Sequence, residues 1–432
     1  MERDPVIDPL SGSARETLLR APRPRRALPV LGGAARHLPL AKEARDVDRA
    51  DRPIHAVWEL TLACDLACRH CGSRAGSARP DELTLPEALH LVDQIADLGV
   101  REVTLIGGEV YLYEGWGEVA RRIRSRGMSC GVVTGGRGFD AERVRLAREA
   151  GVQSIAVSID GDEETHDRLR GVAGSYHAAL RTLALCRAEG MQVSANTQVN
   201  RLSLPHLAGV FERIAEAGCH GWQVQLTVPA GRAADEPDVI LQPFDLLALM
   251  PLLADLRKRC DAAGVTLLPG NNVGYFGPFE HVLRDFYPAG HSGSCGAGRH
   301  GLGIEANGDL KGCPSLPTEG WVGGNLRQHR LVDVWERAGA LRFNRDRTVK
   351  DLWGFCGTCY YADTCRAGCT WMSSSLFGRP GNNPYCHHRA LDFARRGQRE
   401  RLLRVEEAPG TPFDHGRWEL VVEPIPSRHP SF

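Results

Sequence analysis

The sequence lacks the features that mark membrane, secreted and nucleic-acid-binding proteins. No apolar run among its 432 residues is long enough to cross a bilayer, and the amino terminus has no apolar core of a signal peptide. Lysine plus arginine and aspartate plus glutamate are both 53, so the formal net charge is zero. This balance gives no general attraction to nucleic acid or to an anionic membrane. We therefore expect a cytoplasmic protein with neither partner.

Cysteine is the residue in excess. Hydrophobic residues make up 42% and charged residues 25% of the chain, as in ordinary globular proteins, and its length allows two or three domains. In a large chain without an export signal, clustered cysteines favour metal binding or catalysis over disulfides. Ten of the fourteen cysteines are clustered. We expect the four isolated ones to fill the core: Cys130, Cys186, Cys219 and Cys260.

Three cysteines lie within eight residues, at positions Cys64, Cys68 and Cys71. They follow an alternating apolar run, residues 56–62, that indicates a β-strand. A cubane of four irons and four sulfurs normally takes four cysteine ligands, so three would leave one iron open to a reacting molecule. Zinc is the alternative. Structural zinc sites are closed by four ligands, however, and His70 adjoins Cys71 too closely to complete the same site easily.

This Cys-x3-Cys-x2-Cys loop, with His70 before its third cysteine, resembles the signature of radical S-adenosylmethionine (SAM) enzymes. The resemblance implies that the amino and carboxylate groups of SAM chelate the open iron. One electron from the reduced cluster would then cleave SAM to a 5′-deoxyadenosyl radical, which abstracts a substrate hydrogen. It also implies that Cys64, Cys68 and Cys71 are catalytic metal ligands and that His70 belongs to the cofactor site. A reductant such as ferredoxin or flavodoxin would supply the electron.

Strand-like and helix-like segments alternate from about residue 51 to 230. The strand-like runs are apolar or β-branched: Glu102–Ile106, Gly131–Thr134, Ser154–Ile159, Val193–Gln198 and Trp222–Leu226. Helical patterns lie between them, several ending at glycine: Leu85–Leu98, Trp116–Arg126, Ala141–Ala150, Tyr176–Glu189 and Leu204–Ala217. With the first strand they make six β-α units and predict an α/β fold with a parallel sheet. The resemblance implies the family's partial, TIM-like (β/α)6 barrel.

Two further motifs follow predicted strands, and loops at the carboxyl ends of parallel strands are where ligands bind. Gly107 and Gly108 allow the backbone to approach a ligand closely. Glu109 offers a carboxylate suited to a cationic amino group. The run resembles the family's Gly-Gly-Glu-Pro segment, which binds the SAM amino group, with Val110 replacing the proline.

The second motif begins with Ser158 and Asp160 and continues through Arg170 to a Gly-Ser-Tyr run at residues 174–176. It resembles the family's Ser-x-Asp-Gly…His-Asp-x-x-Arg-Gly…Gly-Ser-aromatic run. The resemblance implies that Ser158 and Arg170 contact the ribose and carboxylate of SAM, and that Asp160 and Asn196 belong to the same site. An arginine can hold a carboxylate by two hydrogen bonds. For Asn196 a core or turn role is the alternative.

The carboxyl-terminal half holds the other clustered cysteines: Cys295, Cys313, Cys356, Cys359, Cys365, Cys369 and Cys386. Residues 304–311 predict a β-hairpin with an Asn-Gly turn, which brings Cys313 within reach of Cys295. The pattern resembles the SPASM domain of radical SAM maturases, which implies two auxiliary 4Fe–4S clusters. The outer would be held by Cys356, Cys359, Cys365 and Cys386, and the inner by Cys295, Cys313 and Cys369 without a fourth cysteine. A zinc-ribbon-like structural domain is the alternative.

The patterns divide the chain into five predicted parts. The first is a partly disordered extension, either solvated or a basic arm for an acidic peptide, and the last is a tail that begins with a charged helix over Gln398–Glu407. Between them we expect the barrel, a bridge with an apolar helix over Phe244–Cys260, and the SPASM domain. The boundaries are 1–50, 51–235, 236–290, 291–395 and 396–432.

We predict an enzyme that installs a crosslink, thioether or oxidation on a ribosomally made precursor peptide. One alternative is a SPASM enzyme acting on a protein serine or cysteine or on a tetrapyrrole. Pro314 after Cys313 argues against the first of these, because sulfatase maturases carry an aspartate there. Another alternative is a non-catalytic iron–sulfur electron carrier, which would not need the SAM motifs. The first 50 residues look too short for a winged-helix peptide-binding domain, so we expect a separate protein or the barrel itself to bind the leader.

Overall fold

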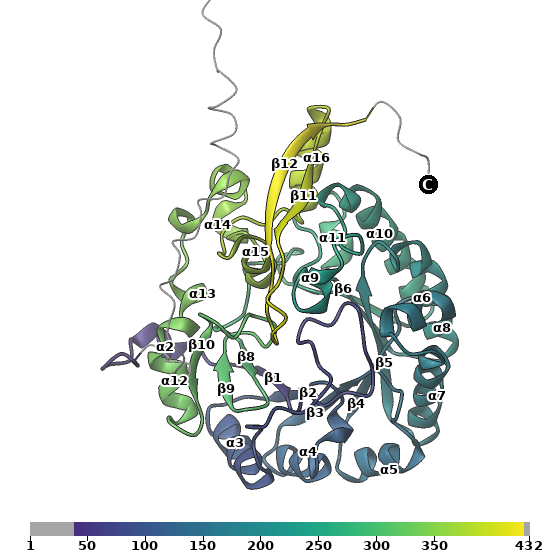
Figure 1. Ribbon diagram of the computed structural model, residues 1–432, viewed down its shortest axis with the longest axis vertical. Helices are drawn as coiled ribbons and strands as arrows, with labels where there is room; N and C mark the ends of the chain where they lie inside the picture. Colours follow the sequence, from purple (N-terminus) through teal and green to yellow (C-terminus); the bar gives the residue numbers. More distant parts are fainter. Residues whose placement is uncertain (1–38, 427–432) are drawn as a thin grey trace, which may run out of the picture.

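A curved sheet of ten strands organises the computed structural model, which describes residues 39–426. The strand order is β10-β9-β8-β1-β2-β3-β4-β5-β6-β7, and neighbours from β1 to β7 are parallel. Their bounds are β1 (His55–Glu59), β2 (Glu102–Ile106), β3 (Ser129–Thr134), β4 (Ser154–Ser158), β5 (Gln192–Val199), β6 (Gly221–Leu226) and β7 (Thr266–Pro269). The strands line the inside of an open ring and the helices cover its outside (Figure 1).

The helices follow the predicted alternation. They are α3 (Leu85–Asp97), α4 (Trp116–Ser125), α5 (Ala141–Glu149), α6 (Glu163–Arg170), α7 (Ser175–Ala188) and α8 (Leu207–Glu216). Helix α3 shows why they form: Thr84 and Glu87 make a capping box at its start, and its buried residues recur at helical spacing against the sheet. The predicted fold class, a partial barrel followed by a cysteine-rich domain, is confirmed. The isolated cysteines are buried as expected: Cys130, Cys186, Cys219 and Cys260.

The segment predicted as a bridge adds more to the sheet than expected. Its apolar helix is present as α10 (Leu246–Ala262). After three intervening residues the chain forms β7, which pairs with β6. At the opposite edge β8 (Gly301–Ile304) pairs in parallel with β1, so the cysteine-rich domain continues the barrel sheet. The predicted hairpin is present in β8 and β9 (Asp309–Lys311), and β10 (Val322–Asn325) closes that edge.

Short elements carry the cysteine-rich part of the chain. They are α12 (Leu331–Arg337), α13 (Phe343–Asp346), η6 (Gly354–Thr358), α14 (Ala362–Cys365), α15 (Thr370–Phe377) and α16 (His387–Arg395). Smaller pieces elsewhere are α2 (Asp46–Ala50), α9 (Arg232–Asp235), η3 (Pro243–Asp245) and α11 (Glu280–Leu283). No helix of the described part is both long and apolar enough to cross a membrane. The predictions for residues 1–38 lie outside the described residues.

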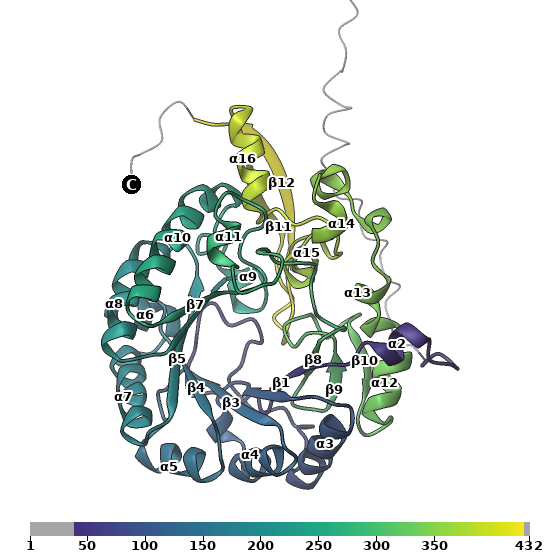
Figure 2. The same cartoon turned by 180° about the vertical axis from the view of Figure 1, so that it is seen from behind.

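The charged helix predicted over Gln398–Glu407 is wrong, because this segment is strand β11 (Gln398–Glu406). It pairs antiparallel with β12 (Arg417–Pro424) in a separate two-stranded sheet. Alternate residues explain the strand: Glu400 and Leu402 are 4% and 3% exposed, while charged neighbours pair across the hairpin. These cross-strand and tertiary contacts override the local helical pattern of charges. Figure 2 shows the hairpin rising beside α16.

A buried ion pair joins α16 to this hairpin. Both nitrogens of the Arg389 fork reach the Glu400 carboxylate, at 2.6 and 2.7 Å, and both residues are almost fully buried. We expect Glu400→Ala to lower the free energy of unfolding by about 3–5 kcal/mol, because it leaves a buried guanidinium without its charge partner. Urea denaturation measures the change. The control is Glu423→Ala, which removes a more exposed carboxylate on β12 and should cost less than about 1 kcal/mol. Equal costs for the two variants would contradict this assignment.

Candidate active site

The cysteine loop after β1 is held against the end of β2 by backbone hydrogen bonds. The Gly108 amide donates to Thr61 O at 2.7 Å, and the Glu109 amide donates to Ala63 O at 2.8 Å. The loop also closes on itself, since the Cys64 amide donates to Gly76 O at 2.9 Å. Its three cysteines thereby line one cavity of about 220 Å³ at the carboxyl ends of the strands: Cys64, Cys68 and Cys71.

The paired glycines make this close approach possible. A Cβ atom on Gly107 would lie 2.3 Å from Thr61 O, and one on Gly108 would lie 2.0 Å from Ala63 O. Both distances are far below contact with backbone atoms that cannot move independently. The sequence reasoning assigned these glycines to ligand approach, and the structure shows that they also seat the cysteine loop while lining the cavity.

Glu109 presents a buried carboxyl group to the cavity. Its side chain accepts hydrogen bonds from Thr134 Oγ1 and from the Gly135 amide, both at 2.6 Å. Burial raises the pKa of Glu109 to about 7, although these hydrogen bonds oppose the rise. One oxygen of the carboxyl lies within 4.8 Å of Cys64 Sγ. The cavity thus combines thiols with an acid whose charge a bound cation would stabilise.

A buried charge network supports the loop from below. Asp160 Oδ2 lies 2.5 Å from Arg170 Nη2 and 3.3 Å from His70 Nε2. Although burial opposes it, the Arg170 guanidinium and the neighbouring His70 hold the pKa of Asp160 well below its usual range. Arg170 Nη1 lies 3.7 Å from Cys68 Sγ, so the guanidinium joins this network to a cysteine.

The predicted SAM contacts differ in their placement. Ser158, Arg170 and His70 line the cavity with the glycines and Glu109. Asp160 and Asn196 are not among its lining residues, and Asp160 instead orients His70 and Arg170. For all of these residues, contact with SAM stays a prediction.

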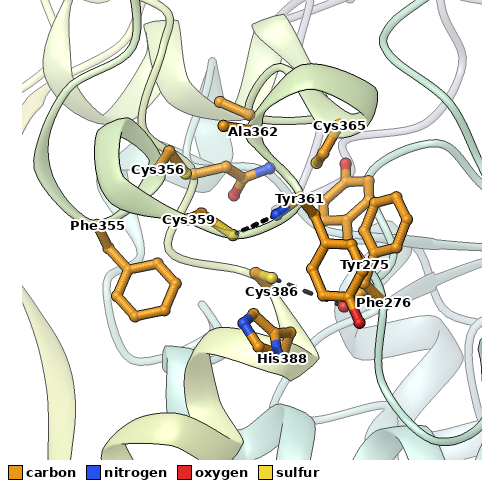
Figure 3. A pocket seen from close by; sticks show the side chains of 12 residues that line it. Tyr275, Phe276, Phe355, Cys356, Cys359, Tyr361, Ala362, Cys365, Cys386 and His388 are labelled. Atoms are coloured by element: carbon orange, nitrogen blue, oxygen red, sulfur yellow. Dashed lines mark hydrogen bonds between the residues drawn. The ribbon is translucent and has the colours of Figure 1, made fainter. Parts of the chain in front are cut away.

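The seven other cysteines separate in space as the sequence groups them. Cys356, Cys359, Cys365 and Cys386 line one pocket with aromatic side chains, and Figure 3 shows this group together. Among those aromatic residues, Phe276 stacks on Tyr361 with ring centroids 4.4 Å apart. The remaining three line a cavity of about 260 Å³: Cys295, Cys313 and Cys369. This inner cavity shares a wall with the first, made of Gln225, Pro314, Ser315 and Trp371.

Several residues that line the first cavity were missed from the sequence. Glu59 and Gln198 lie at the ends of strands, where polar residues in apolar runs are a usable signal. Arg232 matches a less distinctive part of the family pattern, for which a core or turn role was at least as strong an alternative. It lines the cavity and donates from Nε to Cys68 O at 2.6 Å and from its amide to Cys71 O at 2.9 Å. Phe413 reaches the cavity from the loop between β11 and β12, and no local sequence pattern predicts this position.

Comparison with known proteins identifies the family. A model of the radical SAM superfamily matches residues 58–207, and one of the SPASM iron–sulfur cluster-binding domain matches residues 295–360. The AdoMet-dependent heme synthase of Methanosarcina barkeri is 31% identical over 77% of this chain and 95% of its own length. The chain belongs to the radical SAM superfamily and carries a SPASM domain.

Other relatives of this radical SAM chain include the mycofactocin maturase MftC of Mycobacterium tuberculosis, 28% identical over 87% of the chain and 92% of that protein. Among solved structures, anSMEcpe with bound AdoMet has a TM-score of 0.63, with 16% identity over 80% of this chain and 97% of that one. SuiB of Streptococcus suis bound to S-adenosylmethionine has a TM-score of 0.59, with 17% identity over 78% and 76%. These two structures support the fold.

The radical SAM chain is an enzyme whose cofactors are 4Fe–4S clusters and SAM. The residues present fit these groups. Three thiols share a cavity with a buried carboxyl, a guanidinium and a glycine-lined wall, and two further sets of thiols each share a pocket. Protein thiolates are the usual ligands of iron–sulfur clusters.

The glycine contact gives a direct test of how the cysteine loop is seated. We expect Gly108→Ala to lower the iron bound after anaerobic reconstitution by the equivalent of one cluster, because the added Cβ displaces Ala63 and hence Cys64. Gly76→Ala is the matched control: it lies in the same loop, and nothing stands within 4 Å of the added atom. Iron analysis per chain measures both variants. A normal iron content in Gly108→Ala would show that the loop does not need this approach.

Proposed function

We propose that the chain is a radical SAM maturase that modifies a ribosomally synthesised precursor peptide. In this proposal Cys64, Cys68 and Cys71 hold the cluster that binds SAM. The outer and inner cysteine groups each hold an auxiliary cluster, the inner one with three cysteine ligands. When bound, SAM and its cluster supply a 5′-deoxyadenosyl radical able to remove hydrogen from an unactivated carbon.

The protein's own groups bind and orient the cofactor in this proposal. Glu109 accepts hydrogen bonds from the cationic amino group of SAM, and its burial keeps water from competing. Ser158 faces the ribose from the end of β4. Arg170 lies against Cys68 and Asp160, so its main role is to place a positive charge beside thiolates that carry negative charge when loaded.

The polar lining of the first and inner cavities is the observation that supports a peptide substrate. Inward side chains of the strands are polar there, with Glu59 on β1, Gln198 on β5 and Gln225 on β6. Asn271 continues this lining in the inner cavity. Amide and carboxyl groups can both donate to and accept from peptide backbone groups. The flat apolar face of a tetrapyrrole would leave these polar groups without partners, at a cost in free energy.

The relatives support both a peptide substrate and a tetrapyrrole substrate. The match to the mycofactocin maturase covers 87% of this chain, and an SuiB structure contains its precursor peptide SuiA. The identity to heme synthases favours a second candidate, a tetrapyrrole substrate. A ferredoxin or flavodoxin would serve as reductant and a separate protein could present the leader, as we expect from the sequence.

The carboxyl of Glu109 can be tested through SAM affinity. We expect Glu109→Gln to weaken SAM binding by roughly 10- to 100-fold, the loss of a charge-assisted hydrogen bond worth about 1.5–3 kcal/mol. Equilibrium binding of SAM to the anaerobically reconstituted protein measures this change. Glu118→Gln, which neutralises an exposed carboxylate on α4, is the control and should bind SAM normally. Unchanged affinity in Glu109→Gln would remove Glu109 from the SAM site.

The function itself is tested by turnover. Reduced wild-type protein with SAM should form 5′-deoxyadenosine, and co-expression with a short peptide encoded beside it should change that peptide's mass. Cys68→Ala should abolish both. Cys369→Ala should retain 5′-deoxyadenosine formation but lose the modified peptide, because Cys369 lines the inner cavity and not the SAM cavity. If the protein modifies a tetrapyrrole and no peptide, the second candidate is correct. If no 5′-deoxyadenosine forms, the result favours a non-catalytic electron carrier.

A further inference from the structure

The tip of the carboxyl-terminal hairpin reaches the cavity of the cysteine loop. Strands β11 and β12 run beside α15 and α16, and their connecting loop, residues 407–416, descends toward the centre of the ring of strands (Figures 1 and 2). Phe413 on this loop lines the cavity together with the three cysteines and Glu109. It is only 7% exposed. This hairpin lies outside both segments matched by the family models.

Two contacts anchor the tip to the segments that form the cavity. Asp414 Oδ1 accepts a hydrogen bond from Arg74 Nε at 2.7 Å, and Arg74 follows Cys71 by three residues. The Gly231 amide donates to Asp414 O at 2.8 Å. Gly231 itself packs so closely on the cysteine loop that a Cβ atom there would lie 2.3 Å from Cys71 O. The tip is therefore tied to the cysteine loop both directly, through Arg74, and through Gly231, which packs on it.

The ring of Phe413 also packs against a buried cation. Lys311 Nζ lies 4.0 Å from the ring centroid, a cation–π contact, and is itself paired with Glu305 at 2.6 Å. Phe413 has φ +57°, and its neighbour across the contact, Arg74, has φ +53°. Non-glycine residues adopt this left-handed region at an energetic cost, and such residues concentrate at functional sites. Both strained residues lie where the tip meets the cysteine loop.

We propose that the hairpin tip is a wall of the reaction chamber and that Phe413 is a positioning residue for the substrate. The ring closes the cavity beside the cysteine loop, so a substrate segment reaches SAM along the polar wall of Gln225 and Ser315. It also restricts the access of water and oxidants to the thiol site. The substrate part of this inference rests on the proposed function, whereas the closure does not.

Closure is tested on the anaerobically reconstituted full-length protein loaded with SAM. Samples are exposed to ferricyanide for timed intervals and then to N-ethylmaleimide, and peptide mapping shows which cysteines have lost their metal. In Phe413→Ala we expect Cys64, Cys68 and Cys71 to become labelled several-fold faster than in wild type. Cys356 and Cys359 of the outer pocket serve as an internal control and should keep their rate. Equal labelling of the first three in wild type and variant would overturn the proposal.

Two further variants separate closure from general destabilisation. Phe413→Leu restores most of the bulk and should return labelling close to the wild-type rate. Leu403→Ala changes a partly exposed residue of the same hairpin away from the cavity and should label as wild type. Faster labelling at every cysteine in Leu403→Ala would mean that the hairpin merely stabilises the fold, and would overturn the proposal.

A measurement on wild-type protein covers the case in which Phe413→Ala does not fold. The Gly410 and Thr411 amides donate to the Asp414 carboxylate, so hydrogen exchange at these amides reports whether the tip is seated. We expect SAM to slow their exchange, and exchange as fast as in a free peptide with SAM bound would overturn the proposal.

The positioning role of Phe413 is tested by the ratio of 5′-deoxyadenosine formed to peptide product formed. Once a peptide product is known, Phe413→Ala should form more 5′-deoxyadenosine per product than wild type, and an unchanged ratio would overturn the positioning role. If wild type modifies no peptide, the proposed function fails, but the labelling result still decides closure.

Discussion

The close approach of two loops is the constraint on which this site depends. The cysteine loop and the end of β2 share backbone hydrogen bonds that form only because residues 107 and 108 have no side chain. The same approach puts Glu109 beside Cys64, since Glu109 follows the second glycine and its amide donates to Ala63 O. One backbone contact thus sets the distance between the thiols and the carboxyl. The three thiols and the acid are therefore positioned together by one contact between the two loops.

Backbone strain marks the same places. Within residues 39–426, five non-glycine residues have φ in the left-handed region: Arg74, Phe276, Arg366, Ala367 and Phe413. The first and last meet at the cysteine loop, and the other three line or adjoin the outer cysteine pocket. The chain accepts unfavourable backbone angles mainly where it turns around thiols. Such strain persists only when surrounding contacts determine the backbone, as the Arg74–Asp414 ion pair does.

Sequence patterns predicted the barrel well because its strands are buried and parallel. Such strands give continuous apolar runs, and β2 has the bounds predicted for it. The division of the seven later cysteines into two groups came from the family resemblance and not from spacing, and the two groups line separate pockets. Strand β7 and the hairpin of β11 and β12 were missed, since their pairing depends on residues distant in the chain. Asp160 shows the limit within the site: its motif was visible, but its ion pairs with His70 and Arg170 arise only from the packing of α6 beneath the loop.

The cysteine-rich domain cannot be considered apart from the barrel. Strand β8 pairs with β1, the strand that leads into the first cysteine loop, so the two halves share one sheet. Trp371 lies two residues after Cys369, lines both cavities, and approaches the cysteine loop, since a Cβ atom on Gly72 would lie 3.5 Å from its ring. A shift of the inner site would therefore move a wall of the first cavity. Because packed interiors transmit small displacements, the two thiol sites are mechanically linked through this shared wall and need no mobile domain to bring them together.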